Sequence, residues 1–206
     1  MENSKKLIVI IAVFALVMVG AYALYTQLSS RVEHDQLAVL DTQATQPQTP
    51  TGDSSAPEEH DHDHDHEEKS LAPDFTVYDA QGNEVHLSDY FGKPIVLNFW
   101  ASWCGPCQME MPDFNEKFLE LGDEVQFLMV NMTDGDRETV ETASAFISQK
   151  GYAFPVLFDK TYDAANAYGA YSLPMTVLID SSGHIVAYAT GAIDAATLQQ
   201  GIDLIS

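Results

Sequence analysis

Between residues 71 and 206, short apolar runs alternate with stretches in which apolar residues recur every three or four positions. The short runs predict strands, and the longer period predicts amphipathic helices. The expected strands are 75–78, 84–87, 94–100, 125–131, 154–158, 175–180 and 184–188. The expected helices are 105–121, 137–150, 162–168 and 194–204, the last with Asp194 as its N-cap.

The order of these elements predicts an α/β fold with a mixed central sheet flanked by helices. Turn residues separate two pairs of strands, Gln81-Gly82-Asn83 in the first pair and Ser181-Ser182-Gly183 in the second, so each pair is expected to form a hairpin. The strand-helix-strand unit from 94 to 131 is expected to be parallel with a right-handed crossover.

A different pattern precedes this domain. Residues 7–24 are eighteen residues without a charge, and the next charge after Lys6 is Arg31. As a helix this run is roughly 27 Å long, close to the hydrocarbon thickness of a bilayer. Lys5 and Lys6 assign residues 1–6 to the cytoplasm by the positive-inside rule. The sequence thus predicts a membrane segment at 7–25.

Two interpretations of residues 7–25 remain open. An uncleaved anchor gives a single-pass protein of the cell membrane whose C-terminal domain is extracytoplasmic. A cleaved signal, with the A-x-A site Ala21-Tyr22-Ala23, gives a secreted or periplasmic protein. The domain is exported in both cases. No cysteine directly follows the apolar run, so a lipoprotein anchor is excluded.

Residues 26–70 are rich in Gln, Thr, Pro, Ser and acid, which is typical of a disordered linker. Four histidines alternate with aspartates inside this linker: His60, Asp61, His62, Asp63, His64, Asp65 and His66. Imidazole and carboxylate groups are ligands for zinc, copper or nickel, so a metal-binding role is one interpretation. A charged, solvated spacer is the other. Residues 71–206 form the remaining, folded domain.

Charge and cysteine content narrow the possible functions. The formal net charge of −22 excludes a nucleic-acid binder that works by neutralising phosphates. The two cysteines, Cys104 and Cys107, are too few for a disulfide scaffold. A structural zinc site requires four ligands, and the domain otherwise offers only His86 and His184. No metal is therefore assigned to this pair.

The C-x-x-C pair stands where a buried strand meets a helix, in the sequence FWASWCGPC at residues 99–107. A cysteine at a helix start lies near unpaired backbone N–H groups and the positive end of the helix dipole, which stabilise its thiolate. Cys104 is then the nucleophile, and Cys107 is the resolving thiol one turn later. No cofactor is implied beyond this redox-active pair.

These motifs carry a family resemblance. FWASWCGPC, followed by Glu110 and Met111-Pro112 and later by SLPMT at 172–176, resembles the thioredoxin superfamily and, more narrowly, the extracytoplasmic TlpA/ResA-type thiol:disulfide oxidoreductases. The resemblance implies a thioredoxin-like fold over residues 71–206 with an added N-terminal hairpin. It also implies that Pro174 is the family's cis-proline, with Leu173 turned toward an extended substrate. Trp103 is expected to shield the disulfide and contact the partner.

Glu110 is the third candidate catalytic residue. Thioredoxins carry a buried aspartate in the strand before the motif, whereas this chain has Asn98, which cannot accept a proton. Glu110 follows Cys107 by three residues, on the same helical face. ResA-like proteins use this glutamate to tune the thiols and move protons. Independently of the family, a partly buried carboxylate has a raised pKa that suits acid-base work on Cys107.

The sequence therefore predicts an exported thiol:disulfide oxidoreductase that reduces disulfides of other exported proteins. The resemblance implies a membrane electron donor of the CcdA or DsbD kind, and cytochrome c apoproteins as a substrate class. One alternative is a disulfide-forming oxidant of the same fold. A metal-binding or metal-delivery module built on the His/Asp tract is another. A thiol peroxidase requires a peroxidatic cysteine outside the pair, and the chain has no third cysteine.

Overall fold

The structure is a computed structural model that describes residues 18–20, 37–39 and 70–206. Of the predicted membrane segment 7–25, only residues 18–20 are described, and they are helical. In the described ranges, no helix is both long and apolar enough to cross a membrane. The remainder of that segment and most of the predicted linker, including the His/Asp tract, lie outside the described residues.

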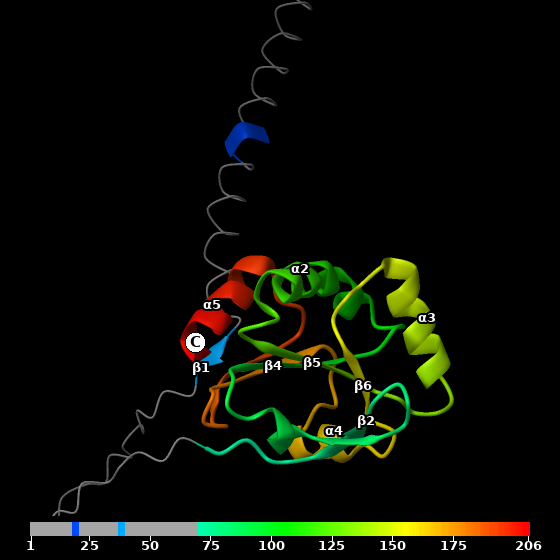
Figure 1. Ribbon diagram of the computed structural model, residues 1–206. Coiled ribbons are helices and arrows are strands. Elements are labelled where there is room, and N and C mark those ends of the chain that lie inside the picture. The colour runs from blue at the N-terminus through cyan, green and yellow to red at the C-terminus, as the bar shows by residue number, and fades with distance from the viewer. Residues whose placement is uncertain (1–17, 21–36, 40–69) are drawn as a thin grey trace, which may run out of the picture. The chain divides into compact units, whose positions relative to one another are not determined.

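The folded part is a mixed sheet with helices on both faces (Figure 1). Its strands are β1 (Ala38–Val39), β2 (Thr76–Tyr78), β3 (Glu84–His86), β4 (Ile95–Trp100), β5 (Gln126–Asn131), β6 (Val156–Phe158), β7 (Met175–Ile179) and β8 (Ile185–Thr190). Its helices are the 3-10 helix η1 (Leu87–Tyr90) and the α-helices α2 (Gly105–Leu121), α3 (Val140–Lys150), α4 (Asp163–Tyr168) and α5 (Ala195–Ile205).

The strand order in the sheet is β1-β8-β7-β4-β5-β6-β2-β3. β4 and β5 are parallel, with Ile95 opposite Gln126, as expected for a strand-helix-strand unit. β7 is antiparallel to both β4 and β8. β2 and β3 form an antiparallel hairpin, and the carboxylate of Asp79 accepts the amides of Gln81 and Asn83 in its turn. The sheet is thus mixed, with β4 at its centre.

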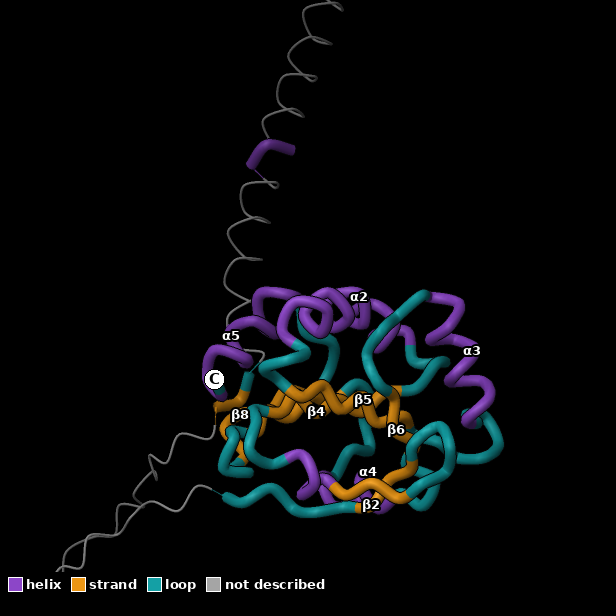
Figure 2. The backbone as a smooth tube through the Cα atoms, viewed as in Figure 1, coloured by secondary structure: helices purple, strands orange, loops and turns teal. Residues whose placement is uncertain are grey.

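The two layers around the sheet explain why β4 is buried throughout. Figure 2 shows the strands between α2, α3 and α5 on one side and α4 on the other. All six residues of β4 are buried, because both faces of this strand are covered. Alternate side chains of a strand point to opposite faces, so Leu97 and Phe99 belong to the cluster that includes Ala164 and Ala165 of α4. Asn98 consequently faces α2.

Most element boundaries differ from the sequence predictions by one to three residues, and one strand is additional. Helix α3 begins at Val140 and not at residue 137, because the Thr139 side chain accepts the amide of Thr142 and caps the helix there. Strand β8 runs on to Thr190, where it pairs with Met175 of β7. Residues 38 and 39, predicted to be linker, pair with β8 as the edge strand β1.

Candidate active site at the start of helix α2

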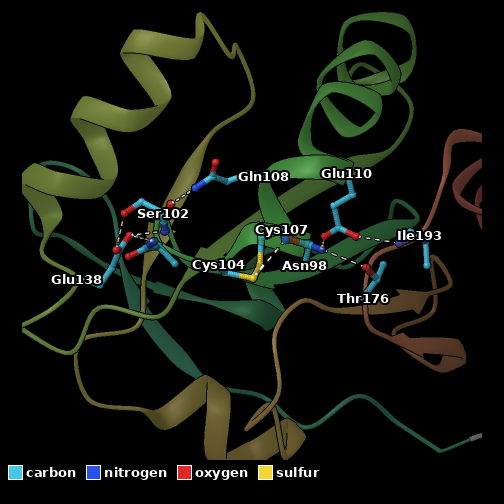
Figure 3. Close-up of a disulfide and its surroundings, with 10 residues drawn as sticks. Asn98, Ser102, Cys104, Cys107, Gln108, Glu110, Glu138, Thr176 and Ile193 are labelled. Carbon is cyan, nitrogen blue, oxygen red and sulfur yellow. Dashed lines mark hydrogen bonds between the residues drawn. A yellow bond between two sulfur atoms is a disulfide. The ribbon is translucent and has the colours of Figure 1, made fainter.

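Cys104 and Cys107 form a disulfide at the first turn of α2, with their Cα atoms 5.3 Å apart (Figure 3). Cys104 is the N-cap of this helix in an extended conformation, and its Sγ accepts the amide of Cys107 at 3.2 Å. Pro106 occupies the first turn, where a missing N–H leaves no bond unmade. Cys104 is 5% exposed and Cys107 is 0% exposed, so Cys104 is the sulfur that a partner reaches first.

Glu110 is buried in the same helix, one turn after Cys107, with 1% of its surface exposed. One carboxylate oxygen accepts the side-chain amide of Asn98 at 2.9 Å, and the other accepts the backbone amide of Ile193 at 3.0 Å. Two neutral donors hold the carboxylate, and neither supplies a positive charge. The site therefore orients Glu110 without neutralising it.

Burial raises the pKa of Glu110 to about 7, against the opposing effect of the bonds from Ile193 and Asn98. Loss of hydration penalises the charged form most, and the negative charge of Asp113 adds to the rise. The raised pKa expected from the sequence is thus found. A carboxyl group with a pKa near neutral pH accepts and returns a proton equally well, which suits general acid-base work.

Asn98 connects Glu110 to the sheet. Its Nδ2 donates both to Glu110 and to the hydroxyl of Thr176 in β7, the latter at 3.1 Å. Its Oδ1 is buried and has no partner within the described part of the chain. Because Asn98 cannot take up a proton, Glu110 is the group in this network that can.

Leu173 and Pro174 immediately precede β7. The peptide bond between them is cis, as the family resemblance implied. Leu173 lies outside the sheet ladder, since β7 begins two residues later at Met175. Leu173 also lines the cleft beside Cys104, whereas Pro174 does not.

This cleft has a volume of about 680 Å³. Trp103, Cys104 and Leu173 all line it, which brings three of the predicted site residues together. Other residues that line the cleft were not predicted as site residues, among them Arg137 and Tyr162. Arg137 belongs to the loop before α3, and Tyr162 has a left-handed backbone with φ of 59° at the start of α4. No short motif connects these positions to the cysteines, so only the fold reveals them.

Within the described ranges, no group of three or more His, Cys, Asp or Glu residues is arranged to hold a metal ion. The predicted metal-binding tract, His60, His62, His64 and His66, lies outside those ranges. The described site itself contains a cysteine pair beside a carboxyl group with a near-neutral pKa. Such a pair exchanges two electrons with another thiol or disulfide.

A family model described as AhpC/TSA matches residues 69–188. The thiol-disulfide oxidoreductase ResA of Geobacillus thermodenitrificans is 37% identical over 137 residues, which are 66% of this chain and 76% of that protein.

Solved structures agree with this match. The Chlorobium tepidum protein described as a DsbE-type thiol:disulfide interchange protein has a TM-score of 0.58 and is 32% identical, over 65% of this chain and 94% of that one. An exposed lipoprotein thioredoxin of Streptococcus pneumoniae has a TM-score of 0.54 and is 34% identical, over 64% of this chain and 100% of that one. The similarity covers the domain that carries the disulfide.

Proposed function

Because the chain belongs to the AhpC/TSA family of thioredoxin-like proteins and is a thiol-disulfide oxidoreductase of the ResA type, we propose that it reduces disulfides in exported proteins. The observation that carries this proposal is the pair formed by Cys104 and Cys107 beside buried Glu110. Cytochrome c apoproteins, whose haem-attachment motif is itself a C-x-x-C, are the proposed substrate class.

The proposed cycle starts from the reduced enzyme. The Cys104 thiolate attacks one sulfur of the substrate disulfide, forming a mixed disulfide, and the other substrate sulfur leaves as a thiolate that takes up a proton. Cys107 gives its proton to the Glu110 carboxylate and attacks the Sγ of Cys104. The second substrate sulfur leaves and takes that proton from Glu110. The substrate gains two electrons and two protons, and the enzyme ends as the disulfide.

The helix start supports this division of roles between the two sulfurs. Cys104 is the more exposed sulfur, and the amide of Cys107 points at it. An N–H donor and the helix dipole both favour the thiolate of Cys104, the form that attacks. Cys107 is fully buried, so its deprotonation requires a nearby acceptor, and Glu110 on the same helical face is that acceptor.

We further propose that the domain works outside the cytoplasm, held to the membrane by residues 7–25. The support is the apolar run at 7–24 behind Lys5 and Lys6, together with the similarity to a pneumococcal thioredoxin that is an exposed lipoprotein. Disulfides persist outside the cytoplasm, so a reductant there requires a supply of electrons. A membrane donor of the CcdA or DsbD kind is the proposed source.

Trapping of the mixed disulfide tests the mechanism. Full-length Cys107→Ser, incubated with an oxidised peptide containing C-x-x-C-H, should accumulate a covalent complex that a reductant releases, because the second step is blocked. Cys104→Ser should form no complex and should show no turnover. Full activity of Cys104→Ser, or an equal yield of complex from both variants, would overturn the proposed roles.

A further inference from the structure

A second buried carboxylate lies near the disulfide, and the proposed cycle does not use it. Glu138 is 0% exposed, although it follows Asp134, Asp136 and Arg137 in a charged loop between β5 and α3. One of its oxygens accepts the backbone amide of Ser102 at 2.9 Å and the side-chain amide of Asn131 at 2.7 Å. The other accepts the hydroxyl of Ser102 at 2.6 Å. Three hydrogen-bond donors thus compensate for the burial of this carboxylate.

Ser102 is held at all of its polar groups. Its amide and hydroxyl bind Glu138, and its carbonyl accepts the side chain of Gln108 in α2 at 2.6 Å. The amide of Cys104 donates to the carbonyl of Ala101 at 3.1 Å, which closes a turn over residues 101–104. Figure 3 shows Ser102 between Glu138 and Gln108, on the side of the disulfide away from Glu110. The residue two positions before Cys104 is therefore fixed from two elements.

Arg137, the neighbour of Glu138, contacts Trp103, the neighbour of Ser102. The guanidinium of Arg137 lies 3.8 Å from the ring centroid of Trp103, a cation-π contact. Consecutive residues of one loop, Arg137 and Glu138, thus bind consecutive residues of the other, Trp103 and Ser102. We name this arrangement the Arg137-Glu138 clamp.

Further hydrogen bonds hold the Arg137-Glu138 clamp in place. The carboxylate of Asp134 accepts the backbone amides of Asp136 and Glu138, both at 2.8 Å, which sets the shape of the loop. The hydroxyl of Thr133 donates to Asn131 at 2.8 Å and so orients the amide that Asn131 offers to Glu138. A carboxylate held in this way imposes one position on its partners, because its own freedom is already restricted.

We propose that Glu138, assisted by Arg137, is a positioning residue that keeps Cys104 at the N-cap of α2, with its sulfur on the amide of Cys107. The inference rests on the proposed role of Cys104 as the nucleophile. An N-cap sulfur keeps its N–H donor only while the chain enters the helix at one angle, and the clamp fixes Ser102 and Trp103 immediately before that point. Loosening the clamp therefore destabilises the Cys104 thiolate.

A role through charge alone predicts the opposite effect. A buried negative charge near a thiol disfavours the thiolate, so removing the charge of Glu138 would lower the pKa of Cys104. Loss of positioning raises that pKa, because the thiolate loses its N–H donor. The other titratable groups that line the cleft with Cys104 are Asp134, Arg137, Tyr162 and Tyr171, and they are left unchanged in the variants below.

Two substitutions separate the contacts of Glu138 from its charge. Glu138→Gln removes the charge but keeps the contacts: its oxygen accepts the amides of Ser102 and Asn131, and its NH₂ donates to the Ser102 hydroxyl. Glu138→Ala removes both charge and contacts. Glu141→Ala is the matched control, because Glu141 is an exposed acid in the first turn of α3.

The readout is the pKa of Cys104, taken from the pH dependence of its alkylation by iodoacetamide in full-length Cys107→Ser protein. Glu138→Ala should raise this pKa by about one pH unit, whereas Glu138→Gln should not raise it and Glu141→Ala should follow the parent. In the two-cysteine enzyme, kcat/KM for the oxidised C-x-x-C-H peptide should fall about tenfold in Glu138→Ala only, since the thiolate is the attacking form.

Two other outcomes would contradict the proposed role of Glu138. A pKa lowered to the same extent by Glu138→Ala and Glu138→Gln would assign the effect to charge, and an unchanged pKa in Glu138→Ala would leave the clamp without influence on Cys104. If Glu138→Ala fails to fold, Ser102→Ala removes one clamp bond and should raise the pKa in the same direction, and no change would overturn the inference. Activity in Cys104→Ser would instead refute the proposed function, independently of the clamp.

Discussion

Replacing Glu110 with glutamine should remove a pH dependence of folding stability that this one residue causes. The pKa of Glu110 in the folded protein is raised from 4.5 to about 7 by burial. In the unfolded chain the carboxyl group is hydrated and loses its proton near its ordinary pKa. The folded state therefore binds one more proton than the unfolded state between these two values.

The sign and the size of the effect follow from this difference. Because the folded-state pKa is the higher one, the stabilisation is complete below about pH 4.5 and is lost as the pH rises through about 7. The rise in pKa corresponds to about 3 kcal/mol of unfolding free energy, at 1.36 kcal/mol for each pH unit. Glu110→Gln keeps a neutral side chain of the same shape at every pH, so this loss is absent in the variant.

Denaturant unfolding of the oxidised full-length protein measures the effect, since the disulfide keeps Cys104 and Cys107 from titrating. From about pH 4 to about pH 9, the unfolding free energy of Glu110→Gln should gain about 3 kcal/mol relative to the wild type. Glu116→Gln, at an exposed position of the same helix, should track the wild type. If the difference in unfolding free energy between Glu110→Gln and the wild type stays constant with pH, the reasoning is refuted.

Two further stability predictions follow from the described contacts, each checked by denaturant unfolding. Phe114 is fully buried in α2, so Phe114→Ala should cost about 3–5 kcal/mol, whereas Leu119→Ala at an exposed position of the same helix should cost far less. Asp194 accepts the amide of Thr197 at 2.8 Å, so Asp194→Ala should cost about 1 kcal/mol. The hydrogen bonds of Thr197 also lower the pKa of Asp194, so the stabilisation by this cap is present at neutral pH and lost below about pH 4. If Asp194→Ala lowers the unfolding free energy as much at low pH as at neutral pH, this assignment is wrong.

Much of the fold follows from local sequence signals. The apolar run at 94–100 predicted a strand buried on both faces, and β4 is that strand. The C-x-x-C pair was predicted at a helix start, where the structure makes Cys104 the N-cap of α2, and Asp194 was predicted as an N-cap and is that of α5. These features depend on a few neighbouring residues, so the sequence alone contains them.

The environment of the site depends on contacts between distant positions. The amphipathic pattern predicted that α3 starts at Arg137, yet Arg137 and Glu138 belong to the loop and bind the segment before Cys104. Glu138 is 36 residues from Ser102, and no local pattern distinguishes its buried carboxylate from its exposed acidic neighbours. Ile193, which orients Glu110, is 83 residues away and contributes only a backbone amide, so its side chain gives no signal.

The equilibrium reduction potential of the Cys104/Cys107 pair tests the central claim most directly. It is measured by equilibrating the full-length protein with glutathione or dithiothreitol mixtures and determining the fraction oxidised. A reductant of exported disulfides should have a potential near the thioredoxin value of about −270 mV. A potential near the value of about −120 mV that DsbA shows would make the protein an oxidant, and the proposed reduction of cytochrome c apoproteins would then be wrong.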